Sequence, residues 1–150
     1  MMNTNKTCPE YATRLKTASD LLNRVKDEIE RGRLVKRNLV WLELTGCSGN
    51  IISLLDGENP DFKYLLSQMT HFIFDNSLVA VEGEAAMDKL MSITDKDYIL
   101  AVEGAVATKN NGLYNIIGRW KGEPVTALKA IQLLGERASH VIAFHWNRAI

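Results

Sequence analysis

The chain opens with one long amphipathic pattern. From Glu10 to Arg31, apolar residues recur at steps of four and three, which places them on one stripe of a helix. The stripe consists of Tyr11, Leu15, Ala18, Leu22, Val25 and Ile29. Gly32 is the expected C-cap. Because an apolar stripe is not stable in water by itself, we expect it to dock on the rest of this chain or on another chain.

Four short apolar runs follow, each typical of a strand that is buried on both faces. These runs are Leu39–Leu42, His71–Phe74, Tyr98–Val102 and Val141–Phe144. Helical spacing is expected between them over residues 51–55, 62–69, 83–93 and 124–138, with Pro124 at the first position of the last helix. Residues 103–123 are irregular in pattern, with a turn signal at 110–112.

Strands that alternate with helices predict a mainly parallel sheet covered on both faces. We therefore predict an α/β fold, a doubly wound parallel sheet with strand order 2-1-3-4 and an extra N-terminal helix. Residues 1–37 form the helix and its linker, and residues 38–150 form the sheet domain. Sites in such sheets lie beyond the C-terminal ends of the strands, which indicates the loops 43–50 and 103–120 and the residues after Phe144.

Composition and charge exclude several classes of function. A hydrophobic share of 46% and a charged share of 24% are those of a folded chain, not of a disordered one. With a formal net charge of zero, we expect no nucleic-acid binding by bulk charge. No apolar run approaches the roughly 20 residues that span a bilayer, so we expect no membrane insertion. Two cysteines and a polar start favour a reducing, cytoplasmic setting.

Cys47 lies in a turn of small residues between a predicted strand and a predicted helix. Backbone N–H groups at a helix start stabilise a thiolate, so Cys47 is a candidate metal ligand, nucleophile or redox thiol, and the alternative is a small packing residue. The turn from Thr45 to Asn50 also offers hydroxyl and N–H groups that could hold the phosphate of FMN. The sequence of the turn by itself does not distinguish among these alternatives.

Two loops together carry a family resemblance. Glu43-Leu44-Thr45-Gly46-Cys47-Ser48 follows the first strand, and Val102-Glu103-Gly104-Ala105 leads to Asn111-Gly112-Leu113-Tyr114 after the third. These motifs resemble the small subunit of nickel–iron hydrogenases, in the flavodoxin-like domain that holds the cluster proximal to the active site, and the related cluster-bearing subunit of respiratory complex I. The resemblance runs from about Leu39 to Phe144. It implies electron transfer in an oxidoreductase, with a nickel–iron large subunit as the partner that holds the catalytic metal.

In that family, four cysteines on three loops bind one [4Fe–4S] cluster. Carried over by position, the resemblance retains Cys47 as one ligand. Leu44, Asn115 and Asn147 stand at the other three positions, and leucine and asparagine do not replace thiolates as soft ligands. We therefore expect a divergent chain whose cluster is absent or incomplete, and we also expect truncation after the fourth strand.

Two carboxylates and one apolar loop complete the expected site. Glu43 aligns with the family's carboxylate near the large-subunit contact, as a proton relay or a capping group, and Glu103 is expected to anchor loop backbone. We expect Cys47, Glu43, Glu103 and Asn115 to cluster at one sheet edge. The loop 103–120 is unusually apolar, so we expect it to form an interface. The alternative functions are an FMN- or phosphate-binding module and a cluster-free interaction protein.

Overall fold

The computed structural model describes residues 9–144, and the chain divides into two compact units, Met1–Val35 and Lys36–Ile150. The first unit contains helix α1, Pro9–Glu30, as the apolar stripe predicts. Gly32 ends it in the left-handed region, at φ +66°, and its N–H donates to the carbonyl of Ile29 over 2.9 Å. This confirms the predicted C-cap, because a residue with a Cβ is strained at such a φ. Among the described residues, no helix is long and apolar enough to cross a membrane.

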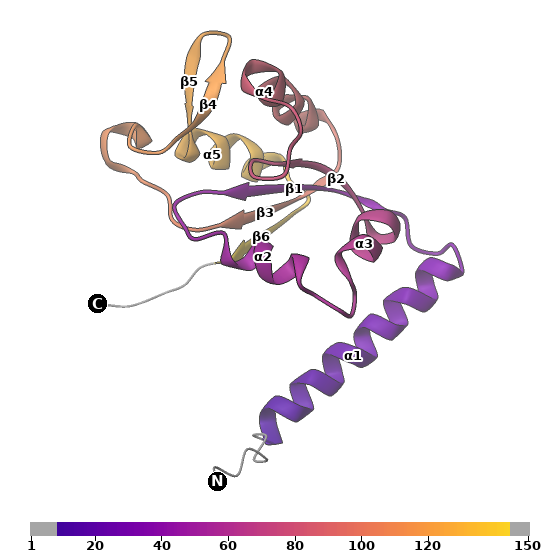
Figure 1. Ribbon diagram of the computed structural model, residues 1–150. Coiled ribbons are helices and arrows are strands. Elements are labelled where there is room, and N and C mark those ends of the chain that lie inside the picture. Colours follow the sequence, from indigo (N-terminus) through magenta and orange to yellow (C-terminus); the bar gives the residue numbers. More distant parts are fainter. Residues whose placement is uncertain (1–8, 145–150) are drawn as a thin grey trace. The chain divides into compact units, whose positions relative to one another are not determined.

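The second unit is built on a parallel sheet of four strands in the order β2-β1-β3-β6. The strands are β1 (Arg37–Glu43), β2 (Thr70–Asp75), β3 (Tyr98–Glu103) and β6 (His140–Phe144). The predicted order 2-1-3-4 is confirmed, since β6 is the fourth strand of this sheet. The four apolar runs predicted as strands all lie in it (Figure 1). The expectation that each is buried on both faces is wrong for β6, which lies at an edge of the sheet and leaves Val141 and Ile142 exposed.

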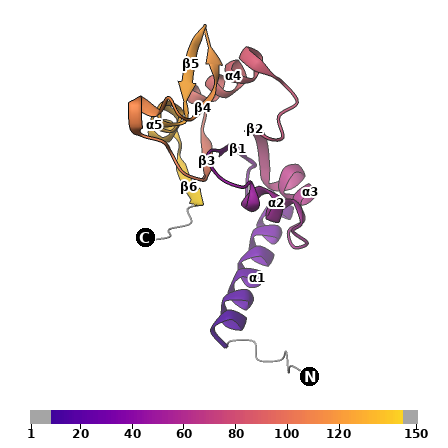
Figure 2. The same cartoon turned by 60° about the vertical axis from the view of Figure 1, so that its left-hand side comes forward.

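Helices cover both faces of the sheet, as predicted (Figures 1 and 2). One face packs against α4 (Gly83–Met91), the 3₁₀-helix η2 (Ser92–Asp95) and α5 (Ala127–Arg137). The other packs against α2 (Gly49–Leu55), and α3 (Phe62–Tyr64) continues there into a π-helical turn, η1 (Leu65–Met69). Alternate residues of β1 serve the two faces. Val40 and Leu42 join the core under α4 and α5, whereas Leu39 and Trp41 join the core beside α2.

The stretch after β3 differs from the prediction. Residues predicted to be irregular form strand β4 (Ile116–Trp120), which pairs antiparallel with β5 (Glu123–Thr126) in a separate hairpin. Pro124 does not open a helix, because it lies in β5. A proline is tolerated there because the hairpin has only two strands and both are edges. Helix α5 begins instead at Ala127, where the Thr126 Oγ1 accepts the Lys129 N–H over 3.2 Å as an N-cap. The turn signal at 110–112 is confirmed by the 3₁₀ turn η3 (Lys109–Gly112).

Candidate functional site at the C-terminal edge of the sheet

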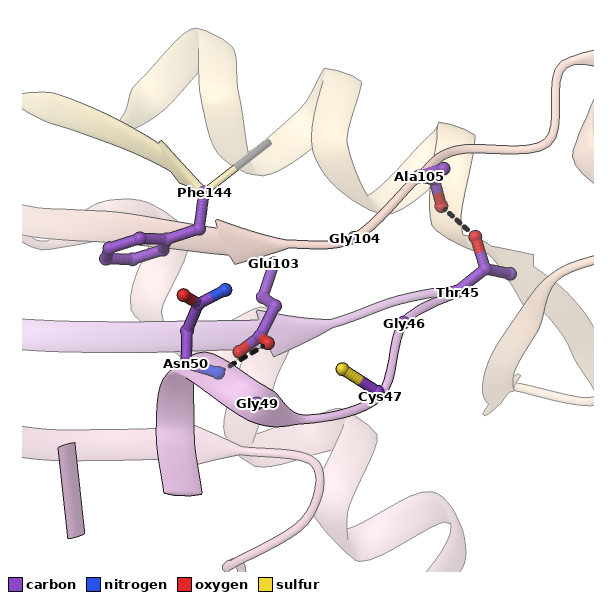
Figure 3. Close-up of a pocket in the computed structure, with 9 residues that line it drawn as sticks. All are labelled: Thr45, Gly46, Cys47, Gly49, Asn50, Glu103, Gly104, Ala105 and Phe144. Atoms are coloured by element: carbon purple, nitrogen blue, oxygen red, sulfur yellow. Dashed lines mark hydrogen bonds between the residues drawn. The ribbon is translucent and has the colours of Figure 1, made fainter. Parts of the chain in front are cut away.

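A pocket of about 400 Å³ opens where β1, β3 and β6 end, at the edge where sites were expected (Figure 3). It is lined by Thr45, Gly46, Cys47, Gly49, Asn50, Glu103, Gly104, Ala105 and Phe144. The strand register explains why the ends of these three strands lie together, because Glu43, Glu103 and Phe144 are paired side by side on β1, β3 and β6. Cys47 is a free, exposed thiol, and its sulfur points to the same side of the turn as the Glu103 carboxylate (Figure 3).

The two loops that line the pocket are joined by hydrogen bonds between Thr45 and Ala105. The N–H of Ala105 donates to the carbonyl of Thr45 over 3.1 Å, and the Thr45 hydroxyl donates to the carbonyl of Ala105 over 2.7 Å. Gly104 lies between them at φ +95°, where a Cβ would stand 2.7 Å from the Thr45 oxygen. Only glycine fits this close approach, so Gly104 is what allows the two loops to lie against each other.

Glu103, the last residue of β3, is 4% exposed, and its carboxylate caps the N-terminus of helix α2. Its oxygens accept the N–H of Asn50 over 2.9 Å and the N–H of Ile51 over 3.3 Å. Ser48, the residue before the helix, makes no side-chain cap of its own. A negative charge at a helix N-terminus is favourable, so Glu103 anchors the Cys47 turn to β3, which is the structural role predicted for it.

Glu43 is 8% exposed and holds the other side of the same turn. Its Oε2 accepts the Ser48 hydroxyl over 2.7 Å and also the Ser77 hydroxyl, while Oε1 has no hydrogen-bond partner. The Asn76 side chain bridges its backbone, accepting the Glu43 N–H over 2.7 Å and donating to the Glu43 carbonyl over 2.8 Å. Glu43 therefore fixes Ser48, the neighbour of Cys47, but it does not line the pocket.

Asp75, Asn76 and Ser77 were not identified from the sequence. Asp75 ends β2, and Asn76 and Ser77 follow it at the same edge of the sheet. The strand-end rule, applied to the loop after β2, would have found them. Asp75 is 1% exposed, and its Oδ1 accepts the N–H groups of Ser77 and Leu78 over 2.7 and 2.9 Å. Burial raises the pKa of the Asp75 carboxyl above its ordinary value, and the charges of Glu43 and Glu103 add to the rise. The two N–H donors oppose it.

The other predicted cluster positions among the described residues, Leu44 and Asn115, do not line this pocket. Leu44 is half-buried and packs against the core under α4 and α5. Asn115 does not line the pocket: its carbonyl accepts the Ala127 N–H over 2.8 Å, and its buried Nδ2 has no partner. Asn147 lies outside the described residues. The structure thus brings Cys47 and Glu103 into one pocket and ties Glu43 to it through Ser48.

The apolar loop after β3 is divided between exposed and packed residues. Leu113, Tyr114 and Ile116 are 54%, 68% and 49% exposed. Ile117 and Trp120 instead pack partly against the core, and the Trp120 Nε1 donates to Asp88 over 2.7 Å. The apolar residues available to a partner are therefore the first three.

The pocket does not suit the phosphate of FMN. The two N–H groups at the start of α2 already bind the Glu103 carboxylate, so an arriving phosphate would compete with it and be repelled by it. Among the described residues that line the pocket, none is a lysine, arginine or histidine. The geometry therefore disfavours the phosphate-binding alternative.

Comparison with known proteins gives a consistent answer, although no family model matches the chain. The periplasmic [NiFeSe] hydrogenase small subunit of Desulfomicrobium baculatum is 31% identical over 116 residues, which are 72% of this chain and 37% of that protein. The uptake hydrogenase small subunit of Azotobacter vinelandii is 28% identical over 109 residues, covering 71% and 29%. The hydrogenase-2 small chain of Escherichia coli K12 is 26% identical over 108 residues, covering 70% and 28%.

Solved structures show the same relationship in three dimensions. The recombinant [NiFeSe] hydrogenase of Desulfovibrio vulgaris Hildenborough superimposes with a TM-score of 0.70 at 26% identity, over 73% of this chain and 40% of that chain. The reduced, active [NiFeSe] hydrogenase of Desulfomicrobium baculatum gives a TM-score of 0.70 at 31% identity, over 73% and 42%. The chain spans less than half the length of these relatives. It carries a hydrogenase small-subunit-like domain and is a divergent relative of the hydrogenase small subunits.

Proposed function

We propose that the sheet domain docks on a hydrogenase large subunit as a small subunit does, without holding a regular [4Fe–4S] cluster. The observation that carries the docking proposal is the group of exposed apolar residues Leu113, Tyr114 and Ile116, where the loop after β3 turns into β4, which we call the docking turn. It follows β3 in the stretch that resembles the family. Exposed apolar side chains grouped on one turn are characteristic of an interface. Tyrosine is among the residues that dominate binding energy at such interfaces.

The absence of a regular cluster is supported by the donor chemistry. A [4Fe–4S] cluster takes four thiolates, and at the carried-over positions only Cys47 supplies one. Leu44 offers a hydrocarbon side chain that packs into the core, and Asn115 offers a carboxamide. Within residues 9–144, no three histidine, cysteine, aspartate or glutamate side chains are grouped so that they could hold a metal ion. These residues do not fit the cluster, so we assign the domain an interaction role and no electron-transfer step.

Co-purification tests the docking proposal directly. The full chain would be co-expressed with the hydrogenase large subunit of its native host, and the large subunit captured through an affinity tag. We expect this chain to be retained, and Ile116→Ser to weaken the binding by about tenfold, as for a central interface residue.

Ile142→Ser is the matched control, since Ile142 is also an exposed isoleucine in a strand, at 46% against 49% for Ile116. It lies outside the docking turn, so the binding should change less than twofold. If the wild-type chain is not retained, or if both variants weaken binding equally, the docking proposal is wrong.

A further inference from the structure

Helix α1 carries an apolar stripe with a seven-residue repeat. Ala18, Leu22, Val25 and Ile29 follow one another at steps of four, three and four, and Tyr11 and Leu15 continue the spacing in the sequence. These steps are those of the two core positions of a coiled coil. Leu21 lies directly beside the stripe and is 60% exposed. The stripe and Leu21 together form what we call the α1 seam.

We propose that the α1 seam pairs with the α1 seam of a second copy of this chain, as an antiparallel two-helix coiled coil that makes the protein a dimer. A two-fold axis makes the interface self-complementary, so each contact occurs twice. In the central layers Leu22 packs on Ala18 of the second copy, and Ala18 packs on its Leu22. This register places Leu21 opposite Leu21 of the second copy, so that the exposed leucine is covered by its own symmetry mate.

Charge complementarity selects this orientation. The same register places Arg14 opposite Glu28 of the second copy, and the pair occurs twice around the axis. Both Glu28 oxygens accept hydrogen bonds from Arg33, Oε2 from Nε over 2.6 Å and Oε1 from a terminal guanidinium nitrogen over 2.5 Å. The Glu28 side chain remains 40% exposed, and each carboxylate oxygen keeps a second lone pair that another donor can reach. A parallel pairing would instead place the apolar Leu21 opposite Lys26. The antiparallel arrangement therefore covers the apolar residue and pairs the charges.

This inference is independent of the docking proposal, because it concerns the first unit alone. The residues on the outer face of α1 fit it. Asp20, Asn23, Arg24 and Asp27 are polar, and they fall at heptad positions that face water in a two-helix coil.

Sedimentation equilibrium of the full chain tests the proposal. We expect a dimer in the wild type. Leu21→Asp should raise the dimer dissociation constant at least about tenfold, because two aspartates would meet at the axis. Asn23→Asp adds the same residue on the outer face and should change the constant less than twofold. Circular dichroism would verify that both variants keep their helix content.

A charge exchange tests the orientation. Arg14→Glu should weaken the dimer by about tenfold, and adding Glu28→Arg to the same chain should restore it to within about threefold. A monomeric wild type would overturn the proposal and indicate that the stripe docks within its own chain. A dimer that the second substitution does not restore would overturn the antiparallel register, and equal effects of Leu21→Asp and Asn23→Asp would overturn the seam.

Discussion

The two faces of the parallel sheet receive residues from the same strands but are covered to different extents. Under α4 and α5, side chains such as Leu90, Leu100 and Leu134 are fully buried in one continuous core. Beside α2, the core is small, and an apolar groove of about 500 Å³ remains open between Leu54, Trp41 and Ile142. The first face stabilises the domain, while the second leaves apolar surface available. The seven-residue helix α2 and the short α3–η1 segment together do not cover a four-stranded sheet.

The largest expected effect comes from the closed face. Leu100→Ala removes a side chain with 0% exposure from the centre of β3, and the packed surroundings cannot fill the space. We expect the free energy of unfolding to fall by about 3 kcal/mol, as for other buried leucines. Urea denaturation followed by circular dichroism measures this. A loss below about 1 kcal/mol would mean that this face is less well packed than its burial indicates.

The next largest effect is expected at the C-terminal edge of the sheet, where the Glu103 carboxylate caps α2. Glu103→Gln keeps the shape but replaces a charged acceptor of two N–H groups with a neutral one. We expect a loss of about 1–2 kcal/mol in the free energy of unfolding. Glu123→Gln, at an exposed position of β5, is the control and should change stability by less than about 0.5 kcal/mol. Equal values for the two variants would show that Glu103 does not anchor the turn.

Asp75, at the same edge of the sheet, should make the stability of the domain depend on pH. Its folded pKa is raised, so the folded state binds the proton more tightly than the unfolded state. The domain should therefore gain stability as the pH falls from neutrality through the raised pKa, and the gain should level off near the unfolded value of about 3.9. In Asp75→Asn we expect this part of the pH dependence to vanish. Thermal melts between pH 7 and pH 4 compare the two slopes, and identical slopes would contradict the role of Asp75.

The smallest effect is expected on the open face. Ile142 lines the apolar groove and is 46% exposed, so Ile142→Ala removes few packed contacts. We expect a loss of about 0.5–1 kcal/mol, well below that of Leu100→Ala. The same denaturation series measures both. If Ile142→Ala lowers the free energy of unfolding as much as Leu100→Ala does, the two faces of the sheet are covered equally well.

Sequence reasoning found the sheet because its strands are continuous apolar runs, which mark the buried central strands β1 and β3 and also the mostly exposed edge strand β6. Runs such as Leu39–Leu42 and Tyr98–Val102 are apolar on both faces, and right-handed crossovers then restrict the strand order. It missed the hairpin of β4 and β5, where Gly118 and Arg119 interrupt the apolar run, because half-exposed strands carry a weaker pattern. The last helix was started three residues early because Pro124 fits a helix start as well as an edge strand.

The candidate site was predicted only in part from the sequence. The strand-end rule placed Cys47 and Glu103 at one edge, where they now line one pocket. That rule does not reveal which amides a carboxylate binds, so the capping of α2 by Glu103 could not be predicted from the sequence. The contribution of Asn76 and Ser77 to holding Glu43 was also missed, since no motif marked the loop after β2. The proximity of Asn115 to Cys47 stays a prediction.

A designed variant tests the cluster proposal in the opposite direction, by supplying the cysteines that this chain lacks. Replacing Leu44, Asn115 and Asn147 together by cysteine supplies thiolates at every carried-over position beside Cys47. If the domain keeps the family's geometry, this variant should take up about four irons per chain on anaerobic reconstitution. It serves as the positive control for the reconstitution itself.

The central claim is that the domain keeps the fold of the hydrogenase small subunits without their regular cluster. Iron and acid-labile sulfide, assayed in the wild-type chain after the same anaerobic reconstitution, test it most directly. We predict well below one cluster per chain, with no difference between the wild type and Cys47→Ser, because one thiolate cannot hold four irons. About four irons and four sulfides per wild-type chain, lost in Cys47→Ser, would contradict the account.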